Sequence, residues 1–117
     1  LMSVLSIILE NINYMAQAKY QIYYQKMIDD NRTLFDRFAK IHQLFEKDQE
    51  LNAEAFHQLG KEVLEVIRDY DRRLCAAMGR GVYSVYSDKL SQKFWDLVRA
   101  DFPKIDLVGV KVKKVTV

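Results

Sequence analysis

The fold of this chain is decided by residues 52–77, NAEAFHQLGKEVLEVIRDYDRRLCAA. Apolar residues recur here at spacings of three and four, which places them along one face of an α-helix. They are Phe56, Leu59, Val63, Val66, Tyr70, Leu74 and Ala77. Asn52 is a favourable N-cap, and Gly79 can end a helix in the left-handed conformation. The pattern predicts a long amphipathic helix.

The sequence before this helix has the same periodicity in two segments. The first stripe is Leu5, Leu9, Ile12, Ala16, Tyr20, Tyr23 and Met27, and the second is Leu34, Phe38, Ile41 and Phe45. Polar residues interrupt the pattern at 29–32, and Thr33 with Asp36 fits a capping box. We therefore expect a long N-terminal helix that is kinked or broken near residues 29–33 and continues to about Lys47.

The sequence after it predicts a fourth helix and then a change of period. Ser87 starts the fourth helix, and Pro103 prevents it from continuing far. From Leu107 to Val117 apolar and lysine residues roughly alternate, which is typical of a half-buried β-strand. No other segment offers a convincing partner, so we expect this strand to pair with another chain.

The expected fold is all-α, a four-helix bundle over residues 1–103 with a C-terminal strand, residues 104–117, that belongs to the same domain. A helix from Ser3 to Asp29 would be about 40 Å long, whereas a compact domain of this size is about 35 Å across. The overlong helix and the unpaired strand both indicate a homodimer. Its predicted interface residues are Tyr14, Tyr20, Tyr23, Tyr24, Val108, Val110 and Val112.

Composition excludes several classes of protein. The 117 residues are 50% hydrophobic and 29% charged with a net charge of +2, so disorder is not expected. The single cysteine excludes an intramolecular disulfide framework and a multi-cysteine zinc site. The apolar start of the chain lacks the basic flank of a signal peptide and is too short to span a membrane. We expect a cytoplasmic protein without a cofactor.

Glu54 and His57 form the one fragment with metal-ligand spacing. Glutamate and histidine at i and i+3 serve as ligands in carboxylate-bridged bundles, but such sites need two copies of this motif and two further glutamates. Only one copy is present, so a pair of boundary residues is the favoured interpretation. Cys75 lies beside Arg72, which could lower the thiol pKa, but a cysteine in an apolar helix is usually a small buried hydrophobe.

Arg37 and His42 have a spacing that resembles the Arg-x4–6-His signature of HEPN-type helical ribonucleases. The resemblance covers these two residues and implies a phosphodiester-cleaving site at a dimer interface. On a regular helix, however, five residues place the two side chains about 140° apart. A solvated arginine and a histidine at the flank of the stripe are therefore the favoured interpretation.

The one basic bias along the sequence lies on the expected strand segment, in Lys104, Lys111, Lys113 and Lys114. Together with the tyrosines and lysines of residues 14–26 they could bind nucleic acid, through phosphate neutralisation and base stacking. Tyrosine is also favoured at protein interfaces, and lysine on an edge strand limits uncontrolled pairing. The sequence thus predicts a non-enzymatic, homo-oligomeric interaction protein, with nucleic-acid binding and the ribonuclease as alternatives.

Overall fold

The computed structural model describes residues 19–77 and 87–110, which form four α-helices and one short 3-10 helix. The α-helices comprise residues 19–30, α2 (Arg32–Lys47), α3 (Gln49–Ala77) and α4 (Ser87–Asp101); the 3-10 helix is η2 (Ile105–Leu107). No strand occurs in these two ranges, and the predicted all-α class is confirmed. None of the described helices is long and apolar enough to cross a membrane.

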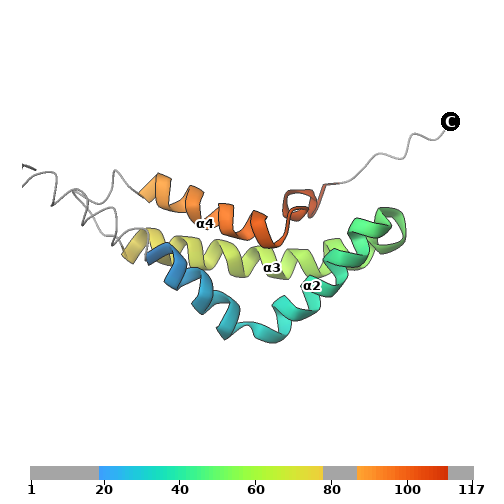
Figure 1. Cartoon of the computed structure of the whole chain (residues 1–117), viewed down its shortest axis with the longest axis horizontal. Coiled ribbons are helices and arrows are strands. Elements are labelled where there is room, and N and C mark those ends of the chain that lie inside the picture. The colour runs from blue at the N-terminus through green and yellow to red at the C-terminus, as the bar shows by residue number, and fades with distance from the viewer. Residues whose placement is uncertain (1–18, 78–86, 111–117) are drawn as a thin grey trace, which may run out of the picture.

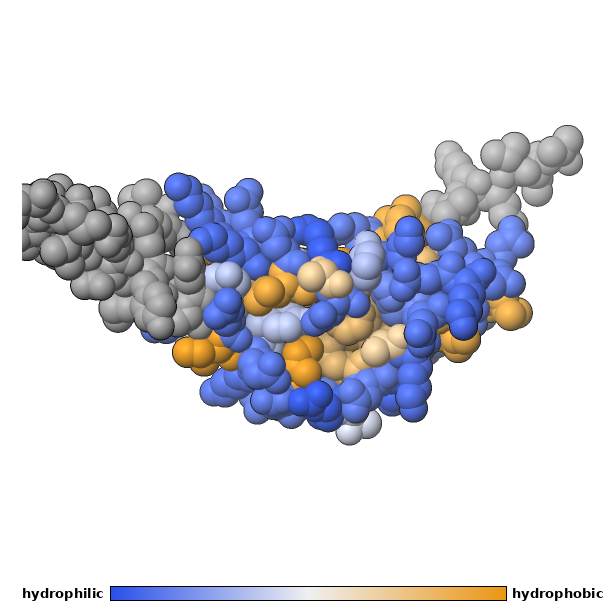
Figure 2. All heavy atoms as spheres, in the orientation of Figure 1, coloured by the Kyte–Doolittle hydropathy of each residue, from blue (hydrophilic) through white to orange (hydrophobic). Residues whose placement is uncertain are grey.

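Helix α3 is the axis of the molecule, and the other helices pack along it (Figure 1). The helix of residues 19–30 and α2 form a V on one side of α3, while α4 and η2 lie along its other side. At 29 residues, α3 is about 43 Å long, enough to contact both arms of the V. On the face drawn in Figure 2, hydrophilic residues cover most of the surface, and apolar residues show in the middle and in smaller patches near both ends.

The apex of the V lies at Asn31, so the expected interruption near residues 29–33 is a break between two helices. The Asn31 side-chain amide donates to the Met27 carbonyl at 3.0 Å, and its backbone N–H donates to the Ile28 carbonyl at 3.3 Å. Both bonds close the last turn of the helix before α2 begins. The expected capping box is wrong, because Thr33 lies inside α2.

A tight corner joins α2 to α3. The Asp48 carboxylate accepts the N–H of Leu51 at 3.1 Å, and α3 begins at the residue after Asp48. Asp48 is therefore the N-cap of α3, four residues before Asn52, the N-cap expected from the sequence. Asn52 instead uses its amide to bond the carbonyls of Leu44 and Asp48, at 3.0 and 2.9 Å. These bonds fix α2 and α3 as an antiparallel hairpin.

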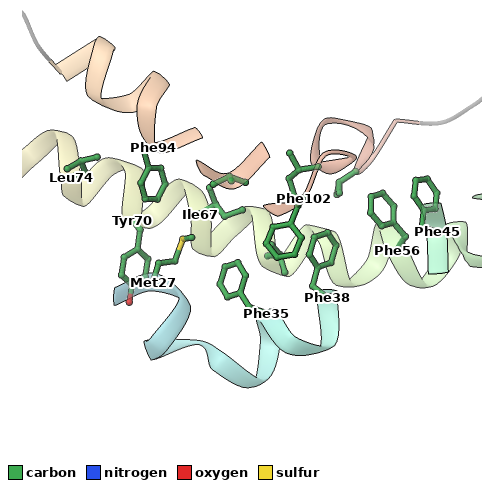
Figure 3. Packing of buried hydrophobic residues seen from close by; sticks show 14 of the residues in the cluster. Met27, Phe35, Phe38, Phe45, Phe56, Ile67, Tyr70, Leu74, Phe94 and Phe102 are labelled. Carbon is green, nitrogen blue, oxygen red and sulfur yellow. The ribbon is translucent and has the colours of Figure 1, made fainter. Parts of the chain in front are cut away.

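The core is a row of aromatic and aliphatic side chains enclosed by all of these elements (Figure 3). The Phe45 ring stacks on the Phe56 ring, with 3.8 Å between the ring centroids. The Phe38 ring also stacks on Phe56, at a centroid distance of 5.6 Å, and contacts Phe102 at 5.1 Å. The buried face of α2 is Phe35, Phe38, His42 and Phe45. The prediction that Leu34 and Ile41 belong to the buried stripe is only partly right, because both remain half-buried at its edge.

The expected C-terminal strand is wrong over its described part. Leu107 ends the 3-10 helix, and the N–H groups of Val108 and Val110 bond the carbonyls of Ile105 and Leu107. Val108, expected at an interchain interface, is instead buried in the core of its own chain. The rest of the expected strand, including Val112 and the lysines at 111, 113 and 114, lies outside the described residues.

Gly60 of α3 explains how this C-terminal segment reaches the core. A Cβ atom at Gly60 would lie only 2.6 and 2.7 Å from the two methyl carbons of Val108. Because glycine has no side chain, Val108 can rest directly on the backbone of α3. The next residue, Gly109, has a φ of +79°, which turns the chain away from the helix.

Candidate interaction site

His42 is a structural residue that is buried at the junction of α2, α3 and the C-terminal segment. Its Nε2 accepts the backbone N–H of Lys104 at 3.0 Å, and its Nδ1 lies 3.0 Å from a carboxylate oxygen of Glu46. The imidazole is therefore neutral, with the proton on Nδ1 donated to Glu46. Burial lowers its pKa from the ordinary 6.5, against the opposing effect of Glu46.

His57 has a parallel role one helix away. Its Nδ1 accepts the backbone N–H of Gly109 at 2.9 Å, so this nitrogen is unprotonated. The two histidines of the chain thus hold the N–H groups at both ends of residues 104–109. We call His42, His57 and their two backbone donors the histidine clamp.

The structure does not bring the candidate catalytic pair, Arg37 and His42, or the candidate metal-binding pair, Glu54 and His57, together as reactive sites. His42 is buried with both nitrogens bonded, whereas Arg37 is exposed on α2 and makes no hydrogen bond to His42. Glu54 is exposed, and within the described ranges no group of three or more histidine, cysteine, aspartate or glutamate side chains could hold a metal ion. Neither pair is supported as a reactive centre.

Three of the predicted interface tyrosines make contacts within the chain. Tyr20, Tyr23 and Tyr24 are half-buried and pack against the core. The Tyr24 ring meets Phe94 of α4 edge-on at 6.0 Å, and its hydroxyl donates to the Asp101 carboxylate. Burial, reinforced by that carboxylate, raises the pKa of Tyr24. Tyr14 lies outside the described residues.

Cys75 is surrounded by acidic groups. Its thiol lies 3.9 Å from Asp71, whose second oxygen accepts the Ser91 hydroxyl at 3.1 Å and the Trp95 indole N–H at 3.2 Å. Burial raises the pKa of Cys75, and the carboxylates of Asp71 and Asp88 raise it further. Nearby Arg72 therefore does not lower the pKa of this thiol, and Cys75 is a half-buried residue bonded to Asp71 and not a buried member of the apolar core.

In the described part of the chain, an open groove of about 510 Å³ lies between α2 and α3. Its apolar residues are Ile41, Leu44, Ala55 and Leu59, and its polar residues are Arg37, Lys40, Gln58 and Glu62. We call this set the α2–α3 groove. Leu44 is 49% exposed, and Leu51, one turn before Ala55 on α3, is 79% exposed.

The charges of the α2–α3 groove are divided between its two helices. Arg37 and Lys40 lie on α2, and Glu62 lies on α3. None of the three forms an ion pair with another described residue. The groove therefore brings partly exposed apolar side chains and charges of both signs without ion-pair partners onto one surface.

The sequence does not predict this surface. Ile41 and Leu59 are expected in the core stripes, and both are half-buried against the core while they also line the groove. Arg37 is expected only as a catalytic candidate. The available signal was Leu44 and Leu51, two leucines that fit neither stripe. Exposed leucines near a helix corner indicate a shared surface only once the hairpin is known to place them on the same side.

Comparison with known proteins gave no match. No family model fits the chain, and no curated protein or solved structure is significantly similar to it.

Proposed function

We propose that this chain is a small helical interaction protein that acts without catalysis and assembles with copies of itself. The observation that carries the proposal is the α2–α3 groove, where apolar side chains and unpaired charges of both signs share one surface. Burying such leucines against a partner contributes about 1.5–3 kcal/mol for each side chain fully removed from water. The free energy of burying this surface therefore favours association with a partner over contact with water.

A binding role is also supported by how the chain uses its reactive side chains. His42 and His57 hold backbone groups, and Cys75 has a raised pKa among carboxylates. These residues stabilise the fold on which the groove is built. The nucleic-acid alternative has less support, because Tyr20, Tyr23 and Tyr24 pack against the core. The lysines Lys111, Lys113 and Lys114 lie outside the described residues.

The solution mass tests the proposal. Light scattering coupled to size-exclusion chromatography should give a mass of at least twice 13.8 kDa at micromolar concentration. Dilution should shift the protein toward the monomer. If the mass stays that of one chain at every protein concentration up to about 100 μM, homo-oligomeric assembly is contradicted.

A further inference from the structure

We infer that the occupant of the α2–α3 groove is the same groove of a second copy, so that two hairpins form a four-helix bundle. This inference rests on the proposed function and assigns its interface. A symmetric pair uses one patch twice, so each feature of the patch must find its complement elsewhere on the same patch. The α2–α3 groove meets this condition, because its bases come from one helix and its acid from the other.

The charge division selects one relative orientation. If the two-fold axis runs parallel to the hairpins, the corner at Asp48 lies beside the corner of the second copy. Helix α2 then lies opposite α3 of that copy and runs antiparallel to it, as in four-helix bundles. With the axis perpendicular to the hairpins, α2 would oppose α2, and Arg37 and Lys40 would face their own counterparts.

Counting residues from the corner shows that the favoured orientation also matches the apolar side chains. Leu44 lies four residues before Asp48 and Leu51 lies three residues after it, so the two exposed leucines come level across the interface. Ile41 and Ala55 are each seven residues from Asp48 and also come level. The aligned set forms an apolar centre.

The same count places opposite charges within reach of each other. Arg37 is eleven residues from Asp48 and Glu62 is fourteen, an offset of three residues or about 4.5 Å along the helix axis. Long side chains span that offset readily. The ion pair would form twice in the dimer and would connect groups that have no ion pair in the described chain.

One pair of variants locates the interface. Leu44→Glu puts a charge at the apolar centre in both copies and should raise the dimer dissociation constant about 100-fold or more. Ile22→Glu is the matched control, because Ile22 is 62% exposed but lies on the helix of residues 19–30. It should leave the mass unchanged. Thermal unfolding of each variant establishes that both remain folded.

The outcomes separate this inference from the proposed function. A wild-type monomer overturns both. A dimer that survives Leu44→Glu, or that is lost only with Ile22→Glu, overturns the groove interface and leaves homo-oligomeric assembly standing.

A charge exchange tests the orientation. Arg37→Glu and Glu62→Arg should each weaken self-association about 10-fold by placing like charges together twice. In an equimolar mixture of the two variants, α2 of one chain and α3 of the other carry opposite charges at both contacts. Wild-type affinity should therefore return in the mixture as a heterodimer. Failure of the mixture to exceed either variant alone would overturn the arrangement of α2 opposite α3.

Discussion

At the residue scale, His42 shows how a polar side chain can occupy a core position. Its ring lies 5.9 Å from Phe38 and 5.6 Å from Phe102 in centroid distance, yet both of its nitrogens have partners. A buried polar group is tolerated when its hydrogen bonds are made, and an unmade bond costs about 1–3 kcal/mol. The partner that makes this position possible is the backbone of Lys104, 62 residues away in sequence.

The first prediction concerns the pH dependence of stability. The folded-state pKa of His42 is lowered below the unfolded value of 6.5. Above pH 6.5 the histidine is neutral in both states. As the pH falls below 6.5, the unfolded chain takes up a proton that the folded chain resists, so the free energy of unfolding decreases by up to about 1.4 kcal/mol per pH unit.

Chemical denaturation between pH 7.5 and 5 measures this slope. His42→Gln removes the titrating group while retaining a side chain that can accept the Lys104 N–H, and it should flatten the profile between pH 6.5 and 5. An identical slope in wild type and variant would contradict the assignment.

Gly60 gives the second prediction at this scale. Gly60→Ala should destabilise the protein, because its Cβ would lie 2.6 Å from a Val108 methyl carbon, and overpacking of this kind costs about 1–3 kcal/mol. Without the clash, alanine in a helix is favoured over glycine by about 1 kcal/mol. In a Val108→Ala background the two methyl contacts are gone and only the residue 108 Cβ remains, at 3.3 Å, so Gly60→Ala should cost much less there. A destabilisation of equal size in both backgrounds would refute a direct Gly60–Val108 contact.

At the element scale, each of the other helices is attached to α3 by its own side-chain hydrogen bonds. Asp48 and Asn52 fix α2 at the corner, and Tyr70 donates to Asp30 at 2.8 Å beside the apex of the V. Asp71 attaches α4 through Ser91 and Trp95. The described part of the chain is thus held by polar contacts at its ends and by aromatic packing along its length.

The third prediction tests the attachment of α4. Asp71→Ala leaves the Trp95 indole N–H and the Ser91 hydroxyl without their acceptor, and should cost about 1–3 kcal/mol. Trp95 is the only tryptophan, so its fluorescence should shift to longer wavelength as α4 loosens.

Asp69→Ala is the matched control on the same helix. Asp69 pairs with Arg72 and Arg73 at the surface, where such ion pairs contribute at most about 1 kcal/mol, and its removal should not move the Trp95 emission. Equal effects of the two substitutions would argue against Asp71 as an attachment point.

At the scale of the whole molecule, α3 contacts partners on two sides and leaves its groove with α2 open. A homodimer that closes this groove couples folding to association, since a partner that binds only the folded chain stabilises it by mass action. The melting temperature should therefore rise with protein concentration. Calorimetry across about a 100-fold range of concentration measures this, and the dependence should disappear in Leu44→Glu. A concentration-independent wild type would contradict coupling of assembly to stability.

Local patterns in the sequence predicted the helices well. Ser87 and Pro103 bounded α4, Lys47 ended α2, and the polar residues around Asn31 marked the break. These features depend on backbone hydrogen bonds between residues three or four apart, so neighbouring residues are sufficient to specify them. The prediction of a strand failed because a local pattern can have two interpretations. The alternation that starts at Leu107 resembles a strand, but Leu107 belongs to a 3-10 helix.

What the sequence determined by itself is a set of amphipathic helices and the breaks between them, because helical periodicity is a short-range property. Only the tertiary structure decided which face of α2 is buried, where Val108 lies and what the histidines do. Each of these depends on contacts between residues far apart in the chain, such as Gly60 with Val108 and His42 with Lys104. The α2–α3 groove belongs to this second group, because it exists only where two helices bring their unpaired side chains together.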